Sequence, residues 1–202
     1  MKKYLSKIPF TVCYFCAMAV LALINHSYID PLSKSWLDRF GFAPCDLWLI
    51  RWERLFTSAL LTGGSTVFWK IIISLLLITG TGEWIKGTKM TIITFCSIHL
   101  VSLISLSLFI ALPLHLAGFY TGTELITGRD VGPSAGIYGI LGMLCSDLPV
   151  KWKWASGITM LTGLIITAFI PGGTTKLTAD LIHIIAFPAG WIFAIFYKKQ
   201  IR

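Results

Sequence analysis

Six apolar stretches, separated by shorter polar segments, divide this chain of 202 residues. They cover about residues 8–24, 66–80, 90–112, 131–145, 154–170 and 177–197. Several are shorter than the roughly 20 residues that a full membrane span needs. We therefore expect packed helices and local thinning of the bilayer rather than six independent rods.

The composition supports a membrane protein. The chain is 55% hydrophobic and 13% charged, with a mean hydropathy of +0.78. These values exclude an ordinary soluble domain and fit one compact polytopic membrane domain. We predict an all-α polytopic membrane protein with six transmembrane helices, forming a single domain over residues 1–202 with the lipid bilayer as a partner.

The net charge of +8 is compatible with nucleic-acid binding, but its distribution favours a membrane orientation instead. An even number of spans places ten basic residues on one side: Lys2, Lys3, Lys7, Lys86, Lys89, Lys151, Lys153, Lys198, Lys199 and Arg202. The positive-inside rule makes that side cytoplasmic. We expect cytoplasmic termini, the cell (plasma) membrane as the location and no nucleic-acid partner.

The first apolar stretch and the loop that follows it each allow an alternative interpretation. The first apolar stretch has a basic start like a signal peptide, but its run is long and no small-x-small site follows cleanly, so we predict a retained helix. The loop over residues 26–65 mixes charges with aromatic residues. We expect short helices lying in the outer leaflet, the alternative being a small extramembrane subdomain.

Cysteine and histidine spacing predicts neither a disulfide nor a metal site. Of the five cysteines only Cys45 is expected outside the membrane, so no intramolecular disulfide is predicted there. No cluster of His, Cys and carboxylate residues has metal-ligand spacing, and we predict no metal and no cofactor.

Two polar residues lie in apolar surroundings. Gly132-Pro133-Ser134-Ala135-Gly136 opens the fourth stretch, and His183 lies within the sixth. A Gly-x-Ser-x-Gly segment presents a reactive hydroxyl in soluble hydrolases. Polar groups within the bilayer are costly unless function requires them. Taken singly, the segment 132–136 has an ordinary interpretation as a small-residue packing motif. His183 has one as a buried histidine whose hydrogen bonds are satisfied.

The predicted depths of the two side chains agree. Ser134 precedes Asp147, the first charge at the cytoplasmic end of its helix, by 13 residues, and His183 precedes Lys198 by 15 residues. At 1.5 Å per residue these offsets are about 20 and 22 Å. In a core of about 30 Å, both lie on the order of 10 Å below the outer surface. This indicates a Ser134–His183 catalytic pair, in which a neutral imidazole takes the serine proton.

Neighbouring residues fit such a pair. Gly132 and Gly136 allow close backbone approach, and the start of the fourth helix places N–H groups near a developing oxyanion. On the helix of His183, Ala186 and Gly190 form a stripe of small residues for packing against the fourth helix. Tyr138, one turn after Ser134, is expected against the imidazole or in simple core packing.

The sequence resembles the rhomboid family of intramembrane serine proteases. The resemblance rests on Gly-x-Ser at the head of the fourth helix, Tyr138 and Gly142 after it, and a His-x-x-Gly-x-x-x-Gly pattern that reads His183, Ala186 and Gly190 here. Arg54, Glu83 and Gly87 also match in order and spacing.

The resemblance implies a Ser134–His183 dyad that cleaves transmembrane protein substrates near their outer ends. It also implies a first loop embedded in the outer leaflet. The fifth helix would act as a substrate gate, with residues 171–178 as a flexible cap loop.

Two positions depart from the family. Its Trp-Arg pair reads Glu53-Arg54, and its His-x-x-x-Asn on the second helix falls on Val67 and Ile71 when residues are counted without gaps. Loss of an oxyanion donor costs about 10²–10³-fold in rate where it has been measured. The alternatives are a slow enzyme, another donor such as Thr66 or Lys70, and a derlin-like protein that only binds transmembrane helices. Derlin-like members, however, generally lack the Ser–His pair.

A channel or transporter is the runner-up class. The predicted spans carry few ionisable groups and show no corresponding broken helices in two halves, which argues against it.

Overall fold

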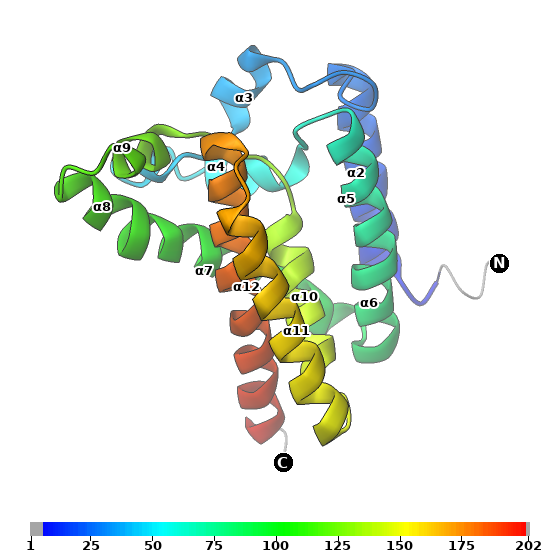
Figure 1. The fold of residues 1–202 in the computed structure, drawn as a ribbon. Helices are drawn as coiled ribbons and strands as arrows, with labels where there is room; N and C mark the ends of the chain where they lie inside the picture. The colour runs from blue at the N-terminus through cyan, green and yellow to red at the C-terminus, as the bar shows by residue number, and fades with distance from the viewer. Residues whose placement is uncertain (1–5, 201–202) are drawn as a thin grey trace.

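The structure, a computed structural model, describes residues 6–200 and the side chains of residues 6–197. Lys2, Lys3 and Arg202 lie outside the described residues, as do the side chains of Lys198 and Lys199. Within residues 6–200 the regular secondary structure is helical, with two isolated β-bridges (Figure 1). The all-α prediction is confirmed.

Each predicted apolar stretch lies largely within a helix. The helices are α2 (Pro9–Asn25), α5 (Thr66–Ser74) continued by η3 (Leu75–Thr79) and α6 (Gly80–Lys86), α7 (Thr88–Leu106) continued by η4 (Ser107–Ala111) and α8 (Leu112–Leu116), α10 (Ser134–Ser146), α11 (Val150–Phe169) and α12 (Gly173–Gln200).

Three helical segments are long and apolar enough to cross a membrane: Thr66–Lys86, Thr88–Leu116 and Gly173–Tyr197. They indicate a multi-span membrane protein. The apolar helices Pro9–Asn25 and Ser134–Ser146 are shorter, with 17 and 13 residues. Within the described residues, three spans are therefore clear, not six.

Contacts at one end of the bundle show that its helices alternate in direction. The carboxylate of Glu83, near the end of α6, accepts the backbone N–H and the hydroxyl of Thr11, near the start of α2, both at 2.8 Å. Lys86 at the end of α6 forms an ion pair with Asp147, which follows α10. Gly87, with φ of 80°, makes the turn from α6 into α7. The start of α2 therefore lies beside the ends of α6 and α10.

The first loop forms short helices, as predicted. They are α3 (Lys34–Phe40), η1 (Pro44–Leu47), α4 (Arg54–Thr57) and η2 (Ser58–Leu60). Together with α9 (Tyr120–Thr127) and α8, they gather at the upper end of the molecule in Figure 1. Trp48, Trp52 and Phe56 are exposed there, as expected of a loop that contacts lipid.

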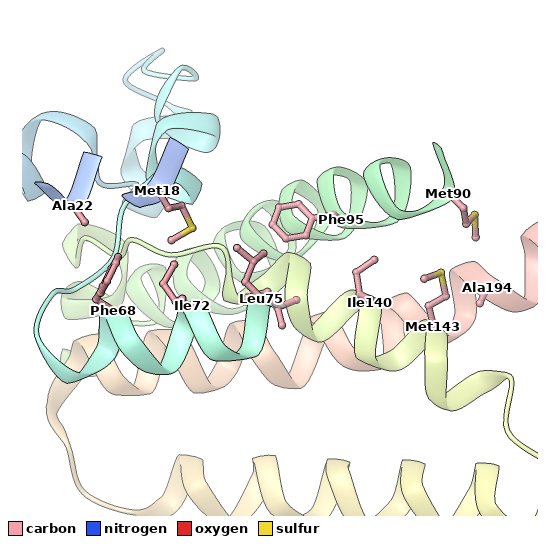
Figure 2. Close-up of a cluster of buried hydrophobic side chains, with 11 residues drawn as sticks. Met18, Ala22, Phe68, Ile72, Leu75, Met90, Phe95, Ile140, Met143 and Ala194 are labelled. Atoms are coloured by element: carbon pink, nitrogen blue, oxygen red, sulfur yellow. The ribbon is translucent and has the colours of Figure 1, made fainter. Parts of the chain in front are cut away.

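The hydrophobic core joins the helices of the bundle but barely involves α11. Figure 2 shows Met18 of α2, Leu75 of η3, Phe95 of α7 and Ile140 of α10 meeting in one cluster. Among the described side chains of α11, only Leu164 is buried. α11 is therefore the least firmly packed of the long helices.

α10 and α12 pack backbone against backbone. A Cβ at Gly190 would overlap the carbonyl of Gly139, and one at Gly142 would overlap the carbonyl oxygen of Phe187. Ala186 is fully buried. Such close approach requires small residues at the contact.

Gly136 contacts a different helix. A Cβ there would lie 2.7 Å from the ring of Phe95, on α7. This glycine therefore serves the packing of α10 on α7 rather than on α12.

The expected cap loop over residues 171–178 is wrong for residues 173–178, because α12 already begins at Gly173. The cause is local. Lys176 donates to the carbonyl oxygen of Ile170 at 3.0 Å and to that of Thr167, at the end of α11. The carbonyl oxygen of Thr167 also accepts the N–H of Ile170 at 3.1 Å, which closes the last turn of α11. Lys176 therefore ties the end of α11 to the first turns of α12.

We predict that Gly190→Ala destabilises the protein, although alanine normally favours a helix by about 1 kcal/mol over glycine. The added methyl group overlaps the Gly139 backbone, and overpacking of this kind costs about 1–3 kcal/mol. Thermal unfolding of the purified protein in detergent measures the change. Gly163→Ala on α11 is the matched control, since its Cβ meets nothing within 4 Å. Equal stability of the two variants would contradict the close contact.

Candidate active site

Ser134 is the first residue of α10. The first helical hydrogen bond of α10 runs from the N–H of Ile137 to the carbonyl of Pro133, at 3.1 Å. The N–H groups of Ser134, Ala135 and Gly136 precede it, and a helix provides no internal acceptor for such groups. The hydroxyl therefore lies beside backbone donors and the positive end of the helix dipole.

The segment that leads into Ser134 is fixed by the first loop. Phe42 and Asp130 exchange two backbone hydrogen bonds of 3.0 and 2.9 Å, and the N–H of Gly132 donates to the carbonyl of Ser58 at 2.9 Å. The N–H of Gly132 is thus already engaged and is not free for an oxyanion. Gly132 has a φ of 144°, a conformation that favours glycine, so its support for the site is conformational.

A buried carboxylate anchors this arrangement. Asp46 has no solvent-exposed surface. It accepts from Arg54 at 3.0 Å, from Arg129 at 2.8 Å and from the N–H of Ala43 at 2.9 Å. Buried charges are tolerated only with partners of this kind. Asp46 therefore joins the first loop to the chain just before Asp130 and Ser134.

His183 lies in α12 with its ring stacked on Tyr138. The ring centroids are 4.2 Å apart and the planes are inclined by 25°. Within the described residues, Nε2 of His183 is buried and has no hydrogen-bond partner. Burial of an unpaired polar nitrogen is costly, so this atom is a candidate for a functional role.

Asp180 does not hydrogen-bond the imidazole in the part of the chain that the structure describes. Its carboxylate pairs with Lys176 at 2.6 Å. It thereby fixes the ammonium group that holds the end of α11.

Ser134 and His183 line the same two cavities, each of about 520 Å³. One cavity extends toward the first loop and is also lined by Asp130 and Lys176. The other lies between α5, α10 and α11 and is also lined by Lys70. Among the described residues, no hydrogen bond joins Ser134 to His183. The fold nevertheless brings these residues, 49 positions apart in the sequence, to one cavity wall.

Val67 and Ile71 line both cavities as well. The gap-free count from Arg54 to Glu83 placed these two residues where the rhomboid family has hydrogen-bond donors. Both side chains are aliphatic, so these two positions offer no donor to an oxyanion. Thr66 does not line either cavity, whereas Lys70 lines one.

One titratable group near Ser134 is unusual. Burial raises the pKa of Asp130 to about 7, and a hydrogen bond from the N–H of Val131 lowers it in part. The cavity wall therefore includes a carboxyl group that is partly protonated near neutral pH.

Several residues that build the site were not found from the sequence. Gly139 belongs to a spacing of three with Gly136 and Gly142, and that pattern of small residues was a usable signal. The sequence carried no such signal for Asp46, Arg129 or Lys176. Their roles depend on contacts between distant segments.

Comparisons of the chain with protein-family models, with curated proteins and with solved structures find no match. The rhomboid resemblance therefore rests on the short sequence motifs alone.

We predict that Asp46→Ala destabilises the protein by about 3–5 kcal/mol, because it leaves the buried Arg54 and Arg129 without their shared carboxylate. Thermal unfolding in detergent measures this effect. Asp38→Ala is the matched control. Its carboxylate is 56% exposed and 3.6 Å from Arg129, and exposed pairs contribute at most about 1 kcal/mol. Similar losses in the two variants would contradict the anchoring role of Asp46.

Proposed function

We propose that this chain is a rhomboid-like intramembrane serine endopeptidase that cleaves transmembrane protein substrates with a Ser134–His183 dyad. One observation carries the proposal. Ser134 and His183 line the same two cavities, with Nε2 of His183 buried and unpaired within the described residues.

The proposal includes six membrane crossings with both termini in the cytoplasm of the cell membrane. Two observations support this topology. The helices alternate in direction, and Lys86 and Lys153 lie at the ends that the positive-inside rule assigns to the cytoplasm. Local bilayer thinning would accommodate the short α2 and α10.

In the proposed reaction, Oγ of Ser134 attacks the carbonyl carbon of the scissile peptide bond while His183 takes the hydroxyl proton. The N–H groups at the start of α10 stabilise the tetrahedral oxyanion. Its collapse breaks the C–N bond, and the imidazolium returns the proton to the leaving amine. Water then hydrolyses the acyl-enzyme by the same steps. Tyr138 holds the imidazole in place by stacking.

A transmembrane segment of the substrate would enter between α5 and α11. The cavity there is lined by Ile71 and Ser74 on one side and by Met160 of α11 on another. Since α11 has a single buried side chain among those described, Leu164, its displacement costs little hydrophobic contact. Lys176 is the tether that such a motion would strain.

A derlin-like protein that binds transmembrane helices without cleaving them is the second candidate. The aliphatic Val67 and Ile71 in the cavity wall favour it, because side-chain donors to an oxyanion are absent from these two positions. The same cavity would then hold an intact helix.

We predict that a fluorophosphonate probe labels the wild-type protein through Ser134. Ser134→Ala and His183→Ala should both abolish labelling, because the hydroxyl is weakly nucleophilic without its base. Ser74→Ala, which alters another serine of the same cavity, and His115→Ala, at the exposed end of α8, should label normally. In-gel fluorescence at equal protein load provides the measurement. Full labelling of His183→Ala would refute the dyad and favour the helix-binding candidate.

A second prediction concerns the oxyanion. If backbone N–H groups alone stabilise it, Ile71→Asn adds a donor and should raise turnover by about tenfold or more, at some cost in stability. Ile73→Asn, on the exposed face of the same helix, is the control and should not raise turnover. The readout is cleavage of one transmembrane reporter that the wild type processes.

The rival donors are tested in the same assay. Under the backbone hypothesis, Lys70→Met and Thr66→Val leave turnover near that of the wild type. A sharp loss in Lys70→Met, combined with no gain in Ile71→Asn, would instead assign the oxyanion to the Lys70 ammonium group.

A further inference from the structure

Another apolar cavity begins one turn along α12 from His183, at Phe187, and continues toward the C-terminal end of that helix. It has a volume of about 230 Å³ and runs between α11 and α12. Its walls include Trp154, Ile158 and Leu161 from α11 and Phe187, Trp191 and Ile192 from α12. Neither Ser134 nor His183 lines it. We call it the α11–α12 groove.

A glycine lets α11 lie close to α12 beside this groove. Gly157 faces the ring of Trp191, and a Cβ there would lie 2.5 Å from it. From Trp154 to Leu161 the wall of α11 extends about 10 Å, at 1.5 Å per residue. A cavity of about 230 Å³ along this length fits an extended hydrocarbon chain better than another helix, whose diameter is about 10 Å.

One end of the groove is basic. The ammonium group of Lys153 lies 5.7 Å from the ring of Trp191, and that of Lys151 lies 5.6 Å from the ring of Trp152. Within the described residues, no carboxylate forms an ion pair with either lysine. The carboxylates at this end of the bundle are engaged elsewhere, since Asp147 pairs with Lys86 and Glu83 accepts the N–H groups of α2.

We propose that the α11–α12 groove binds an anionic phospholipid, with an acyl chain along the apolar walls and the headgroup phosphate at Lys151 and Lys153. The charge at one end and the apolar walls beyond it complement the two parts of such a lipid. Basic pockets between membrane helices bind anionic headgroups in this way. The proposal does not depend on the proposed protease activity.

Bound lipid would also compensate for the weak packing of α11. The helix buries one described side chain, Leu164, which packs in a cluster with Phe187 and Trp191 of α12. A lipid that binds only the folded protein stabilises it in proportion to its concentration. Anionic lipid should therefore raise the unfolding temperature, whereas a zwitterionic lipid with the same chains should raise it less.

The test uses the purified full-length protein in mild detergent, titrated with dioleoyl phosphatidylglycerol and followed by thermal unfolding and native mass spectrometry. Dioleoyl phosphatidylcholine tests the headgroup, and dihexanoyl phosphatidylglycerol tests the acyl chain. Lys151→Gln/Lys153→Gln should weaken phosphatidylglycerol binding by about 30-fold. Lys34→Gln/Arg39→Gln, which removes the same charge from α3, should leave it unchanged.

A second readout locates the acyl chain of the bound lipid. Dioleoyl phosphatidylglycerol brominated on its acyl chains should quench tryptophan fluorescence more than brominated phosphatidylcholine. Trp154→Phe should reduce that difference, and Trp191, the other tryptophan of the groove wall, accounts for the rest. The proposal would be overturned if the two headgroups bound equally, or if the short-chain lipid bound as well as the long-chain one. It would also be overturned if the α3 control variant lost as much binding, or if Trp154→Phe left the quenching unchanged.

Discussion

The buried carboxylate of Asp46 is the interaction on which the candidate site depends. Its partners come from two separate parts of the chain, Arg54 in the first loop and Arg129 before α10. Arg54 is buried and 17% of the Arg129 side chain is exposed, while the carboxylate itself is fully buried. It is stable there only while both arginines remain bound. The isolated β-bridge between Phe42 and Asp130 lies beside this anchor. Together they determine where α10 begins, and thus where Ser134 lies.

A second constraint is the close packing of α10 on α12. Because glycine at positions 139, 142 and 190 lets the two backbones touch, the rings of Tyr138 and His183 stack at 4.2 Å. Larger residues would separate the helices and open the cavity wall that Ser134 and His183 share. Packing and candidate chemistry therefore rest on the same small residues, which is how a compact bundle can hold a polar pair within apolar surroundings.

α11 differs from the rest of the bundle. It contributes little to the core, and its C-terminal end is tied to α12 by Lys176. At its other end, the α11–α12 groove and two lysines are available to lipid. A helix held by a polar tether and by lipid, rather than by core packing, can move without disrupting the fold. This accords with substrate entry beside α11 in the proposed reaction.

By itself the sequence determined the apolar helices, their order and the two residues of the candidate dyad. Hydrophobic runs report burial directly, and a serine and a histidine in such runs are conspicuous because polar groups there are costly. Counting residues without gaps also predicted that Val67 and Ile71 lie at the site, and both line its cavities. The sequence did not reveal Asp46, Arg129 or the helical start of α12 at Gly173, nor that Gly136 would face α7. Only the tertiary structure decided these. The start of α12 depends on side-chain hydrogen bonds of Lys176 to the end of α11, which no apolar run reports. The roles of Asp46, Arg129 and Gly136 depend on contacts between segments far apart in the chain, and such contacts leave no local periodicity to read.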